Sequence, residues 1–553
     1  MRATSPASHC RSMAATALRE PAMSDPGMNL YNELHGITVP ALLRRRAERY
    51  PFQLALSAQS HRGYRDRLSY AQLVMRMDAV ARGLAERGVK SGERIALFLS
   101  NSAVREAVLT ALGCYRLGAI VAPLNVRGAD EELRHALTLV EPAFIVTTAD
   151  AAERLRSLYP AARMLMLGGA PYAGDGWPDP ELEFHRAALP ENECAETPTV
   201  LLFTSGTTAR SKAVTHCHRS QLFCGYAIGG AIGLSNRDTY QGAWPIFTSS
   251  VLNMACMSAW VYGASVVLEE TPLDNAGRLH LIETEGTTVY HGVTSPLHFM
   301  IDEYQRGGYD LSRVRRIAYG GAAMPAEVIE KFRERLPRAD QVHVWGMTET
   351  GPAGTYLAPW FLPRKAGCIG AAQPGCSVRV VDEDGAPVST GESGELLFSG
   401  PAMALGYFRN PEATRETFVD GWVRTGDIGR MDEEGHFHFV DRKKDIINRG
   451  GLKISSAAVE DVIYRFAGVS EAAVVAIPHA GLGEDVAACV VAAAGVTLDT
   501  GALQAHCARH LADYATPRRW FILPALPKNP MGKILKRELR DALLLQLQGQ
   551  EAA

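Results

Sequence analysis

The sequence carries no surplus of charge of either sign, and this excludes some kinds of partner. Lysine and arginine number 57 against 60 aspartates and glutamates, so the formal net charge of the 553 residues is −3. Proteins that bind nucleic acids or anionic membrane surfaces through charge usually have a basic excess. We therefore expect no nucleic-acid partner.

Paired cysteines are missing as well. No two cysteines form a C-x-x-C pair, so no zinc ribbon or redox motif is indicated. His216, Cys217 and His218 are consecutive, and adjacent ligands on one short segment make a poor tetrahedral metal site. We interpret the cysteines as reduced, mostly buried thiols of a cytoplasmic protein. The ten cysteines are Cys10, Cys114, Cys194, Cys217, Cys224, Cys256, Cys368, Cys376, Cys489 and Cys507.

No apolar run is long enough to predict a transmembrane segment. Residues 251–268 come nearest, but Asn253, Ser258 and Gly263 interrupt them, which indicates a buried helix running into a strand. The hydrophobic content of 47% and the charged content of 21% are typical of a soluble enzyme with a large core. A chain of 553 residues should contain two or more domains.

The first 22 residues differ in composition from the rest of the chain. They carry three arginines against one acid, Glu20, among many alanines and serines, as mitochondrial transit peptides do. Met13, Met23 and Met28 follow one another closely, so an over-long gene start, with Met23 as the true one, is the simpler explanation. We expect residues 1–28 to be a disordered extension or a mis-assigned start. The expected location is cytoplasmic, with the mitochondrion as the alternative.

Helix and strand patterns alternate over the first half of the chain. Helices are predicted at 41–50, 69–88, 104–117, 130–140 and 220–233, and strands at 94–99, 120–123, 143–147 and 239–243. Repeating βα units of this kind predict a mainly parallel sheet covered by helices. Short strands at 378–382, 394–399 and 436–440, with Gly and Asp turns between them, predict an all-β region. From residue 459 onward, the order helix, strand, strand, helix predicts a small α+β domain.

The stretch Leu201–Lys212 has the composition of an anion-binding loop. Residues 200–203 predict a short buried strand, and Gly206 lets the loop that follows curl so that its N–H groups point inward. Hydroxyl groups and Lys212 surround this loop, as suits a polyphosphate. It is not a Walker loop, because Ser211 stands where that motif needs glycine. Taken alone, the stretch fits a Ser/Thr-rich surface turn about equally well.

Three further stretches favour phosphate binding. They are Val344-Trp-Gly-Met-Thr-Glu-Thr350, Asp441-Arg-Lys-Lys-Asp-Ile-Ile-Asn-Arg-Gly-Gly-Leu-Lys453 and Leu526-Pro-Lys-Asn-Pro-Met-Gly-Lys533. Together with the first stretch, and in this order, they resemble the motifs of the adenylate-forming superfamily, which includes acyl-CoA synthetases, luciferases and peptide-synthetase adenylation domains. The resemblance covers about residues 30–545. The chain departs from the family's phosphate-loop signature at Ala209, Ser211 and Ala213.

The resemblance implies a fold of the α/β class. Residues 29–441 would form a large N-terminal AMP-binding domain, built from βα-type parallel sheets and a small β-barrel-like region. Residues 442–446 would be a hinge, and residues 447–553 a small mobile α+β C-terminal domain.

The resemblance also assigns roles to individual residues. Glu349 would hold Mg²⁺, and Lys533 would be a mobile catalytic lysine acting together with Thr204 and Glu349. Lys444 would be the hinge residue, and Gly450-Gly451 would border the entry of the CoA thiol. The residues that would bind ATP or AMP are Thr204, Ser205, Gly206, Thr207, Thr208, Lys212, Gly320, Gly321, Ala322, Trp345, Gly346, Met347, Thr348, Asp427 and Arg442.

The expected acyl pocket has no charged wall. Thr248 stands where the family usually has histidine, and Val251 where it usually has glycine. No carboxylate occurs between residues 247 and 258, so an α-amino acid, whose ammonium group would need one, is not expected. We predict an aliphatic acid of short to medium length or an alicyclic acid. The expected pocket residues are Thr248, Val251, Asn253, Tyr290 and His291.

The sequence thus predicts an ATP-dependent acyl-CoA synthetase with ATP, Mg²⁺ and coenzyme A as cofactors or co-substrates and a small carboxylic acid as partner. Three alternatives stay open. They are a ligase that loads an acyl carrier protein, an oxygenating relative of luciferase, and a nucleotide-binding relative whose catalysis is impaired by the changes at Ala209, Ser211 and Thr248. The oligomeric state is open too, with a homodimer as one option.

Overall fold

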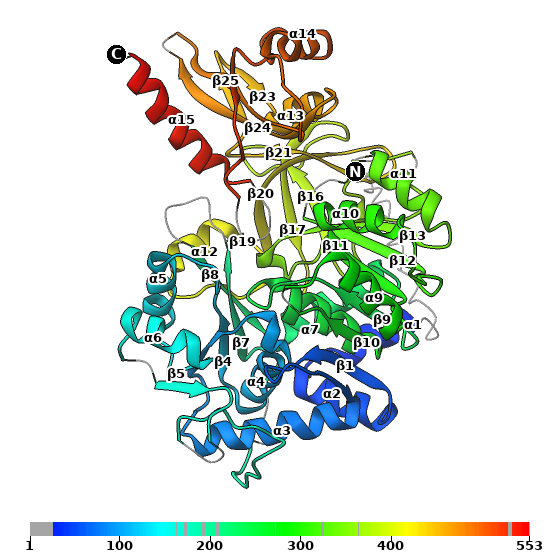
Figure 1. Cartoon of the computed structure of the whole chain (residues 1–553), viewed down its shortest axis with the longest axis vertical. Coiled ribbons are helices and arrows are strands. Elements are labelled where there is room, and N and C mark those ends of the chain that lie inside the picture. Colours follow the sequence, from blue (N-terminus) through cyan, green and yellow to red (C-terminus); the bar gives the residue numbers. More distant parts are fainter. Residues whose placement is uncertain are drawn as a thin grey trace, which may run out of the picture.

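The structure is a computed structural model that describes residues 26–161, 163–170, 174–190, 194–204, 211–270, 272–321, 324, 326–362, 364–365, 367–479, 481–528 and 534–551. The predicted N-terminal extension, residues 1–28, falls outside this set except for its last three residues. Figure 1 shows a large N-terminal domain and, above it, a smaller C-terminal domain that contains the end of the chain.

A nine-stranded sheet forms one half of the large domain. Its six inner strands run parallel, whereas the pairings at both edges of the sheet are antiparallel. The spatial order is β15 (Ala371–Ala372), β14 (Gly354–Leu357), β13 (Asp340–Gly346), β12 (Arg316–Gly320), β11 (Val289–Val293), β9 (Thr239–Gly242), β10 (Ser265–Leu268), β1 (Leu54–Gln59) and β2 (Arg65–Ser69).

A seven-stranded sheet forms the other half. Its strands β7, β4, β3, β5 and β6 are parallel, and β8 and β18 continue the sheet in antiparallel fashion. The order is β18 (Gly406–Tyr407), β8 (Lys212–Cys217), β7 (Pro198–Thr204), β4 (Ile120–Pro123), β3 (Arg94–Phe98), β5 (Phe144–Thr147) and β6 (Arg163–Met166). The predicted α/β architecture with mainly parallel sheets is confirmed.

The main core lies between the two sheets. Helix α4 (Val104–Leu117) is buried at every position except Arg116, and a helix without an exposed face must lie between layers. The same hydrophobic cluster joins Val108 of this helix to Val266 of the nine-stranded sheet and Val121 of the seven-stranded one.

The other helices of the large domain are α1 (Pro26–Glu33), α2 (Val39–Arg49), α3 (Tyr70–Glu86), α5 (Asp130–Val140), α6 (Ala149–Leu158), α7 (His218–Ala231), α8 (Met257–Tyr262), α9 (Asn275–Glu285), α10 (Thr294–Tyr304), α11 (Ala326–Arg335), α12 (Pro411–Thr417), the short 3-10 turns η1 (Asn101–Ala103) and η3 (Thr348–Thr350), and the π-helix η2 (Ser250–Cys256).

Local capping explains where the helix predicted at 69–88 begins. Ser69 belongs to strand β2, and its hydroxyl accepts the N–H of Gln72 while the Gln72 side chain accepts the N–H of Ser69. This reciprocal pair satisfies two N–H groups that the first turn of a helix leaves without partners. The helix therefore begins at Tyr70, one residue later than predicted.

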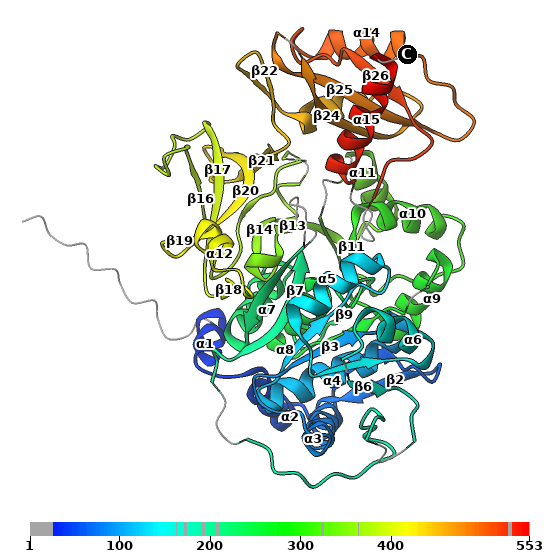
Figure 2. The same ribbon diagram turned by 90° about the vertical axis from the view of Figure 1, so that its left-hand side faces the viewer.

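The all-β region predicted from the strands at 378–382, 394–399 and 436–440 is a five-stranded antiparallel sheet, beside the small domain in Figure 2. Its strands are β16 (Ser377–Val381), β17 (Ser393–Ser399), β20 (Trp422–Met431) and β19 (Phe418–Val419), with β21 (Phe437–Arg442) paired to β20.

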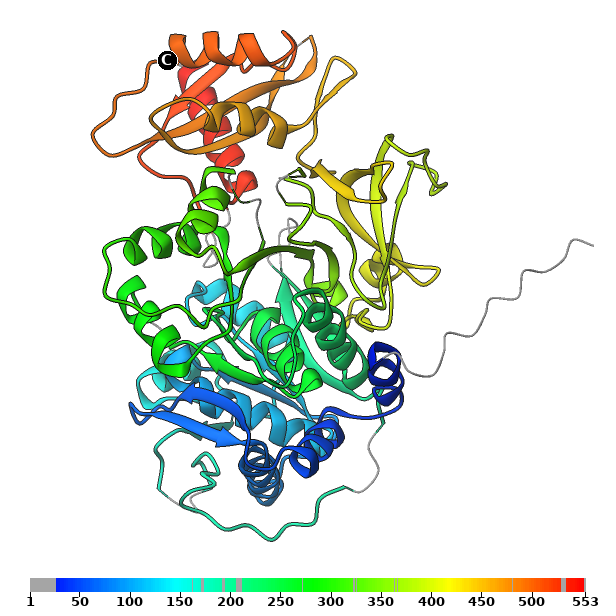
Figure 3. The same cartoon turned by 90° about the vertical axis from the view of Figure 1, so that its right-hand side faces the viewer.

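The small domain has a hydrophobic core of its own, which includes Ile447, Val474 and Val490. The predicted helix, strand, strand, helix order is confirmed by α13 (Ser456–Tyr464), β24 (Val469–His479), β25 (Gly483–Ala492) and α14 (Thr500–His510). Three strands and the last helix of this domain were not among the predicted elements: β22 (Ile447–Arg449), β23 (Leu452–Ile454), β26 (Arg519–Ile522) and α15 (Lys536–Glu551). Figure 3 shows α15 close to where the two domains meet.

Asp441, the penultimate residue of β21, ties the two domains together. Its Oδ2 accepts hydrogen bonds from Oγ of Ser456 at 2.8 Å and from the N–H of Ala457 at 3.2 Å, both in the first turn of α13. Oγ of Ser455 lies 2.8 Å from the carbonyl oxygen of Val440. The carboxylate thus satisfies one N–H group of the first helical turn and faces the positive end of the helix dipole, which is favourable.

The described part of the chain contains nine cysteines, and all are free thiols. Cys194 is exposed and Cys376 half-buried, and the other seven are buried. Burial raises the pKa of the Cys507 thiol to about 11 and that of Cys489 to about 12. Among the described helices, none is both long and apolar enough to cross a membrane.

Candidate active site

Several of the predicted nucleotide-binding residues lie where parallel strands end. Strands β11, β12 and β13 are parallel neighbours, so their carboxyl ends lie at the same edge of the nine-stranded sheet. Gly320 ends β12, and Gly346 ends β13. In open α/β sheets, ligands bind outside the carboxyl ends of the strands.

The expected phosphate loop connects two strands of a β-hairpin. Thr204, the last residue of β7, pairs with Lys212, the first residue of β8, so the loop leaves and re-enters the sheet at one point. Nζ of Lys212 lies 4.8 Å from the centroid of the Tyr407 ring, which places the cation against the aromatic face. The predicted phosphate-binding residues Ser205, Gly206, Thr207 and Thr208 lie outside the described residues.

Glu349 is a buried carboxylate with a hydroxyl donor that the sequence did not reveal. It lies in η3 and is 6% exposed. The hydroxyl of Tyr407 donates a hydrogen bond of 2.7 Å to its Oε1. Burial, followed by the nearby charge of Glu349, raises the pKa of Tyr407, so this hydroxyl stays protonated at neutral pH. Tyr407 therefore touches both Lys212 of the phosphate loop and Glu349.

His216 fixes the turn that carries Thr348 and Glu349. Its Nε2 lies 2.8 Å from the carbonyl oxygen of Thr348, and since a carbonyl only accepts, this nitrogen carries the proton. Nδ1 lies 3.0 Å from Oγ of Ser220. Burial lowers the pKa of His216 to about 4, so the ring is neutral. Nδ1 of His218, in contrast, accepts the N–H of Val39. The two histidines therefore have separate structural partners.

Three of the glycines expected to bind ATP or AMP, Gly320, Gly321 and Gly346, are required for different structural reasons. A Cβ at Gly320 would lie 2.5 Å from the carbonyl oxygen of Val344, and one at Gly346 would lie 1.8 Å from that of Pro352. These two glycines allow close approach of neighbouring backbone. Gly321, in contrast, is exposed and has a left-handed φ of +82°, so it offers bare backbone at the sheet edge. Ala322 lies outside the described residues.

Asp427 and Arg442 are brought together by strand pairing. They are direct partners in the β20–β21 register, and Nε of Arg442 lies 2.7 Å from Oδ1 of Asp427. The Asp427 side chain is 2% exposed, whereas that of Arg442 is 34% exposed. A buried carboxylate held by a guanidinium is a rigid acceptor, which suits the recognition of a pair of hydroxyls.

Gly450 and Gly451 form the turn between β22 and β23. Their φ angles are +59° and +88°, and Arg449 pairs with Leu452 on either side of them. A two-residue hairpin turn with positive φ at both positions requires residues such as glycine. The glycine pair therefore has a local structural reason in addition to the role that the resemblance implies.

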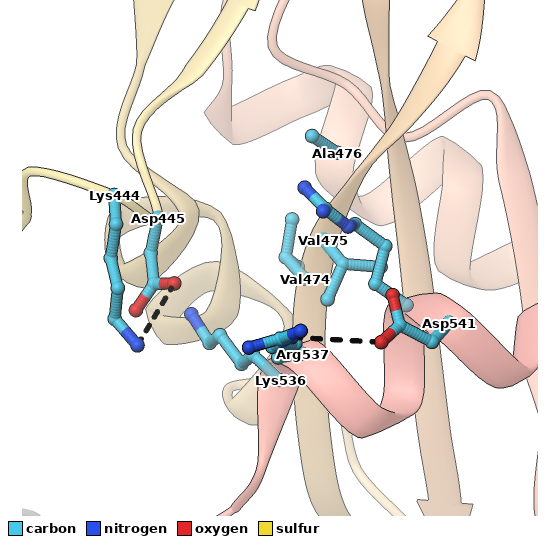
Figure 4. Close-up of a pocket in the computed structure, with 9 residues that line it drawn as sticks. Lys444, Asp445, Val474, Val475, Ala476, Lys536, Arg537 and Asp541 are labelled. Carbon is cyan, nitrogen blue, oxygen red and sulfur yellow. Dashed lines mark ion pairs between the residues drawn. The ribbon is translucent and has the colours of Figure 1, made fainter. Parts of the chain in front are cut away.

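Lys444 lies in the linker between β21 and β22, and its side chain is 41% exposed. Nζ of Lys444 is 3.9 Å from Oδ1 of Asp445 (Figure 4). Lys533 lies outside the described residues. The loop that contains it is closed by a β-bridge between Lys528 and Ile534, so it begins and ends on the small domain.

Four of the five expected pocket residues are buried, and the fifth, Thr248, is half-buried. Thr248 is half-buried, and its hydroxyl donates to the carbonyl of Pro245 over 2.8 Å. Val251 has no exposed surface and packs in the main core, inside the π-helix η2. Oδ1 of Asn253 accepts from Gln221 of α7 at 2.9 Å. Of these three residues, Thr248 alone retains exposed surface.

Tyr290 and His291 also have polar partners in the interior of the protein. The hydroxyl of Tyr290 donates to Oε1 of Glu269 at 3.1 Å, and Glu269 also forms a buried ion pair of 2.9 Å with Arg278. Nδ1 of His291 lies within hydrogen-bond distance of the hydroxyl of Tyr240, at 2.6 Å. Burial lowers the pKa of His291 to about 3, so it is a neutral ring at physiological pH. Glu269 was missed because it lies outside every motif, and only the fold brings it to Tyr290.

Comparison with known proteins finds matching family models and similar relatives. The family model described as "AMP-binding enzyme" matches residues 43–408, and the model of the "AMP-binding enzyme C-terminal domain" matches residues 458–533. A feruloyl-CoA synthase of Amycolatopsis sp is 33% identical over 86% of this chain and 93% of its own length. A long-chain-fatty-acid–CoA ligase of Mycobacterium tuberculosis is 32% identical over 86% of this chain and 93% of its own.

Solved structures are similar over nearly the whole chain. The ATP-bound MatB of Rhodopseudomonas palustris has a TM-score of 0.81 at 28% identity, over 92% of this chain and 99% of its own. The o-succinylbenzoate CoA synthetase of Bacillus subtilis, in complex with its acyl-adenylate intermediate, also has a TM-score of 0.81, at 26% identity, over 91% of this chain and 99% of its own.

Proposed function

Because the chain belongs to the AMP-binding enzyme family and is an acid–thiol ligase, we propose that it joins an uncharged-tail carboxylic acid to coenzyme A through an acyl-adenylate. The observation that carries this proposal is the line of contacts from Lys212 through Tyr407 to Glu349. It joins a phosphate-loop cation to a buried carboxylate at the carboxyl edge of the sheets.

In the first half-reaction, a carboxylate oxygen of the acid attacks the α-phosphorus of ATP and pyrophosphate leaves. Thr204 and Lys212 bind the phosphates at the mouth of the hairpin loop. Asp427 and Arg442 bind the ribose, and Gly321 and Trp345 border the adenine. Lys533 donates to the oxygens on which charge develops, and such donors act most strongly where water is excluded.

Glu349 fits a magnesium site. Its carboxylate is buried, and a hydroxyl donor, not a cation, holds one oxygen. Mg²⁺ is usually bound by one or two carboxylates together with substrate phosphates and water. Within the described residues no group of three or more metal-ligating side chains occurs. When bound, Mg²⁺ would neutralise charge on the phosphate oxygens.

In the second half-reaction, the CoA thiol attacks the acyl carbon of the adenylate and AMP leaves. Lys533 and the β22–β23 turn both belong to the small domain, so one rotation about Lys444 would withdraw the lysine and present Gly450-Gly451. Such a domain rotation is a familiar way to let one site serve two steps.

For the substrate, we keep an aliphatic acid of short to medium length or an alicyclic acid. The feruloyl-CoA synthase and the long-chain-fatty-acid–CoA ligase named above are nearly equally identical to this chain although their names give very different acids, so identity alone selects neither acid. Thr248, which is half-buried and has an uncharged side chain, favours an uncharged tail. A misplaced methylene costs only about 1–3 kcal/mol, so several related acids should react.

Pyrophosphate release tests the proposal. The full chain is incubated with ATP, Mg²⁺ and each of a panel of acids, with and without CoA, and acyl-CoA is measured in parallel. We expect acid-dependent release and a CoA thioester. Release without a thioester would instead favour a carrier-protein ligase, and no release with any acid would favour a nucleotide-binding relative with impaired catalysis.

A further inference from the structure

A cavity of about 360 Å³ lies where the large domain passes into the small one. One wall is formed by Lys444 and Asp445 of the linker, a second by residues 474–476 of β24, and a third by the first turns of α15. In Figure 4 the amino groups of Lys444 and Lys536 point toward the same space, one from the linker and one from the helix. The volume falls at the lower end of the range for small-molecule sites.

Positive charge dominates the lining of this cavity. Four lining side chains are basic and two are acidic, an excess of two positive charges. The basic residues are Lys444, Lys536, Arg537 and Arg540, and the acidic ones are Asp445 and Asp541.

The acidic groups around the cavity lie at different distances from its cations. Nζ of Lys536 lies 2.7 Å from Oε1 of Glu460, a residue outside the lining. The two aspartates of the lining are more distant from their partners: Lys444 and Asp445 are 3.9 Å apart, and Arg537 and Asp541 are 3.7 Å apart. These two separations exceed hydrogen-bond length, so each of these pairs contributes little.

Burial and the neighbouring charges together lower the pKa of the Lys444 amino group. Burial lowers its pKa most, and the nearby Asp445 raises it, while the cations Arg442, Lys536 and Arg537 each lower it further. A cation that is disfavoured by neighbours of like sign gains from any anion placed between them. Guanidinium groups add planar, two-pronged donors that match phosphate oxygens.

We propose that this cavity binds a phosphate ester or phosphoanhydride group, and that the bound group holds the small domain in its present orientation. Lys444 belongs to the linker, whereas Arg537 and Arg540 belong to α15, so a ligand that contacts both sides spans the joint. A ligand shifts a conformational equilibrium by its difference in affinity between the two states. The source of the group rests on the proposed function, whose reaction involves two such compounds: pyrophosphate, and the 3′-phosphorylated nucleotide end of CoA.

Labelling of Lys444 tests the site directly. The full chain is treated with limiting acetic anhydride, and acetylation of each lysine is followed by peptide mass spectrometry, with and without inorganic phosphate, pyrophosphate or adenosine 3′,5′-bisphosphate. Because only the empty site is labelled, a ligand at four times its Kd should slow acetylation of Lys444 about fivefold. The exposed Lys90 of the large domain should be labelled at the same rate throughout.

Paired variants separate the cavity from the phosphate loop, which also binds phosphates. Protection of Lys444 should be lost in the double variant Arg537→Gln/Arg540→Gln. It should persist in Arg509→Gln, which removes an exposed arginine from α14. Thermal unfolding of each variant shows whether the fold is intact.

Each outcome has a distinct meaning. Protection by pyrophosphate identifies the leaving product as the source, and protection by the bisphosphate identifies the CoA end. If no phosphate compound protects Lys444, or if the double variant is protected as well as the parent, the proposal is wrong. Pyrophosphate release is measured on the same preparation. If the cavity binds phosphate but the protein releases no pyrophosphate with any acid, this inference stands and only the proposed function is wrong.

Discussion

The contact between Tyr407 and Glu349 gives the sharpest prediction. In Tyr407→Phe the ring that faces Nζ of Lys212 is kept, and only the hydroxyl that donates to Glu349 over 2.7 Å is lost. A hydrogen bond to a charged group contributes about 1.5–3 kcal/mol, and at 6% exposure Glu349 has little access to water as a replacement donor. We therefore expect adenylation to slow by roughly 10- to 150-fold.

The assay compares the two half-reactions. Pyrophosphate release is measured over a range of Mg²⁺ concentrations, and thioester formation is measured separately from supplied acyl-AMP. A carboxylate that has lost its orienting donor should need more Mg²⁺ for the first reaction, while the second should be nearly unchanged. Calorimetric titration of Mg²⁺ with a non-hydrolysable ATP analogue should show the same weakening without turnover.

A matched control and a double-mutant cycle decide whether Tyr407 acts through Glu349. Tyr262→Phe also removes one partly buried hydroxyl hydrogen bond, to the carbonyl of Tyr226 at 2.9 Å, and should change stability but not the Mg²⁺ dependence. If Tyr407 works through the carboxylate, Tyr407→Phe should cost almost nothing in a Glu349→Gln background. Losses that simply add would refute the reasoning.

Four further predictions concern single residues. Glu349→Gln keeps the shape of the side chain and should slow adenylation while sparing thioester formation from acyl-AMP, and an equal loss in both would make Glu349 structural. Lys533→Ala should slow acyl-AMP formation by ~10²–10³. Lys444→Pro fixes one backbone angle of the linker, so it should slow the thioester step more than acyl-AMP formation. If both variants slow both steps alike, the proposal that the small domain takes two orientations is wrong. Val251 packs in the main core, so Val251→Gly should open space there and shift kcat/KM toward longer acids; an unchanged chain-length profile would show that the acyl pocket does not reach this residue. Burial lowers the pKa of His218 from 6.5 to about 3. Below pH 6.5 the unfolded chain therefore binds a proton at this residue that the native state does not bind, so stability falls as the pH drops through this window. His218→Asn keeps an acceptor for the N–H of Val39 and should flatten the dependence of Tm on pH between pH 6.5 and 4, whereas a slope equal to that of the parent would contradict the prediction.

Elements whose signal is local could be predicted from the sequence. The helix at 104–117 and the strand at 120–123 are found at the predicted residues, because an apolar helix followed by Gly118 and a short apolar run leaves little choice. Gly118 adopts the left-handed conformation that ends the helix. The β22–β23 hairpin was missed because its strands are three residues long and carry charges rather than an alternating pattern.

Contacts within the site were harder to predict, because they depend on strands far apart in sequence. Tyr407 reaches Glu349 only since β18 pairs with β8, which lies far earlier in the chain. The sequence offers Tyr407 merely as an aromatic residue after a glycine. Asn253 and Tyr290 were expected in the acyl pocket, yet each has a polar partner inside the core, Gln221 and Glu269 respectively. Which face of a buried helix or strand a polar residue takes is decided by such partners, and periodicity does not reveal them.

The tie between Asp441 and the first turn of α13 bears on the order in which substrates are used. Rotation about the linker would break three hydrogen bonds between the domains, those of Ser455, Ser456 and Ala457. At about 1 kcal/mol each, the rotated arrangement would be populated in roughly one molecule in 150 before any ligand binds. A co-substrate that needs the rotated arrangement would then see its apparent affinity reduced by the same factor. An ordered sequence of binding would follow from this population ratio, even if the binding sites themselves were open from the start.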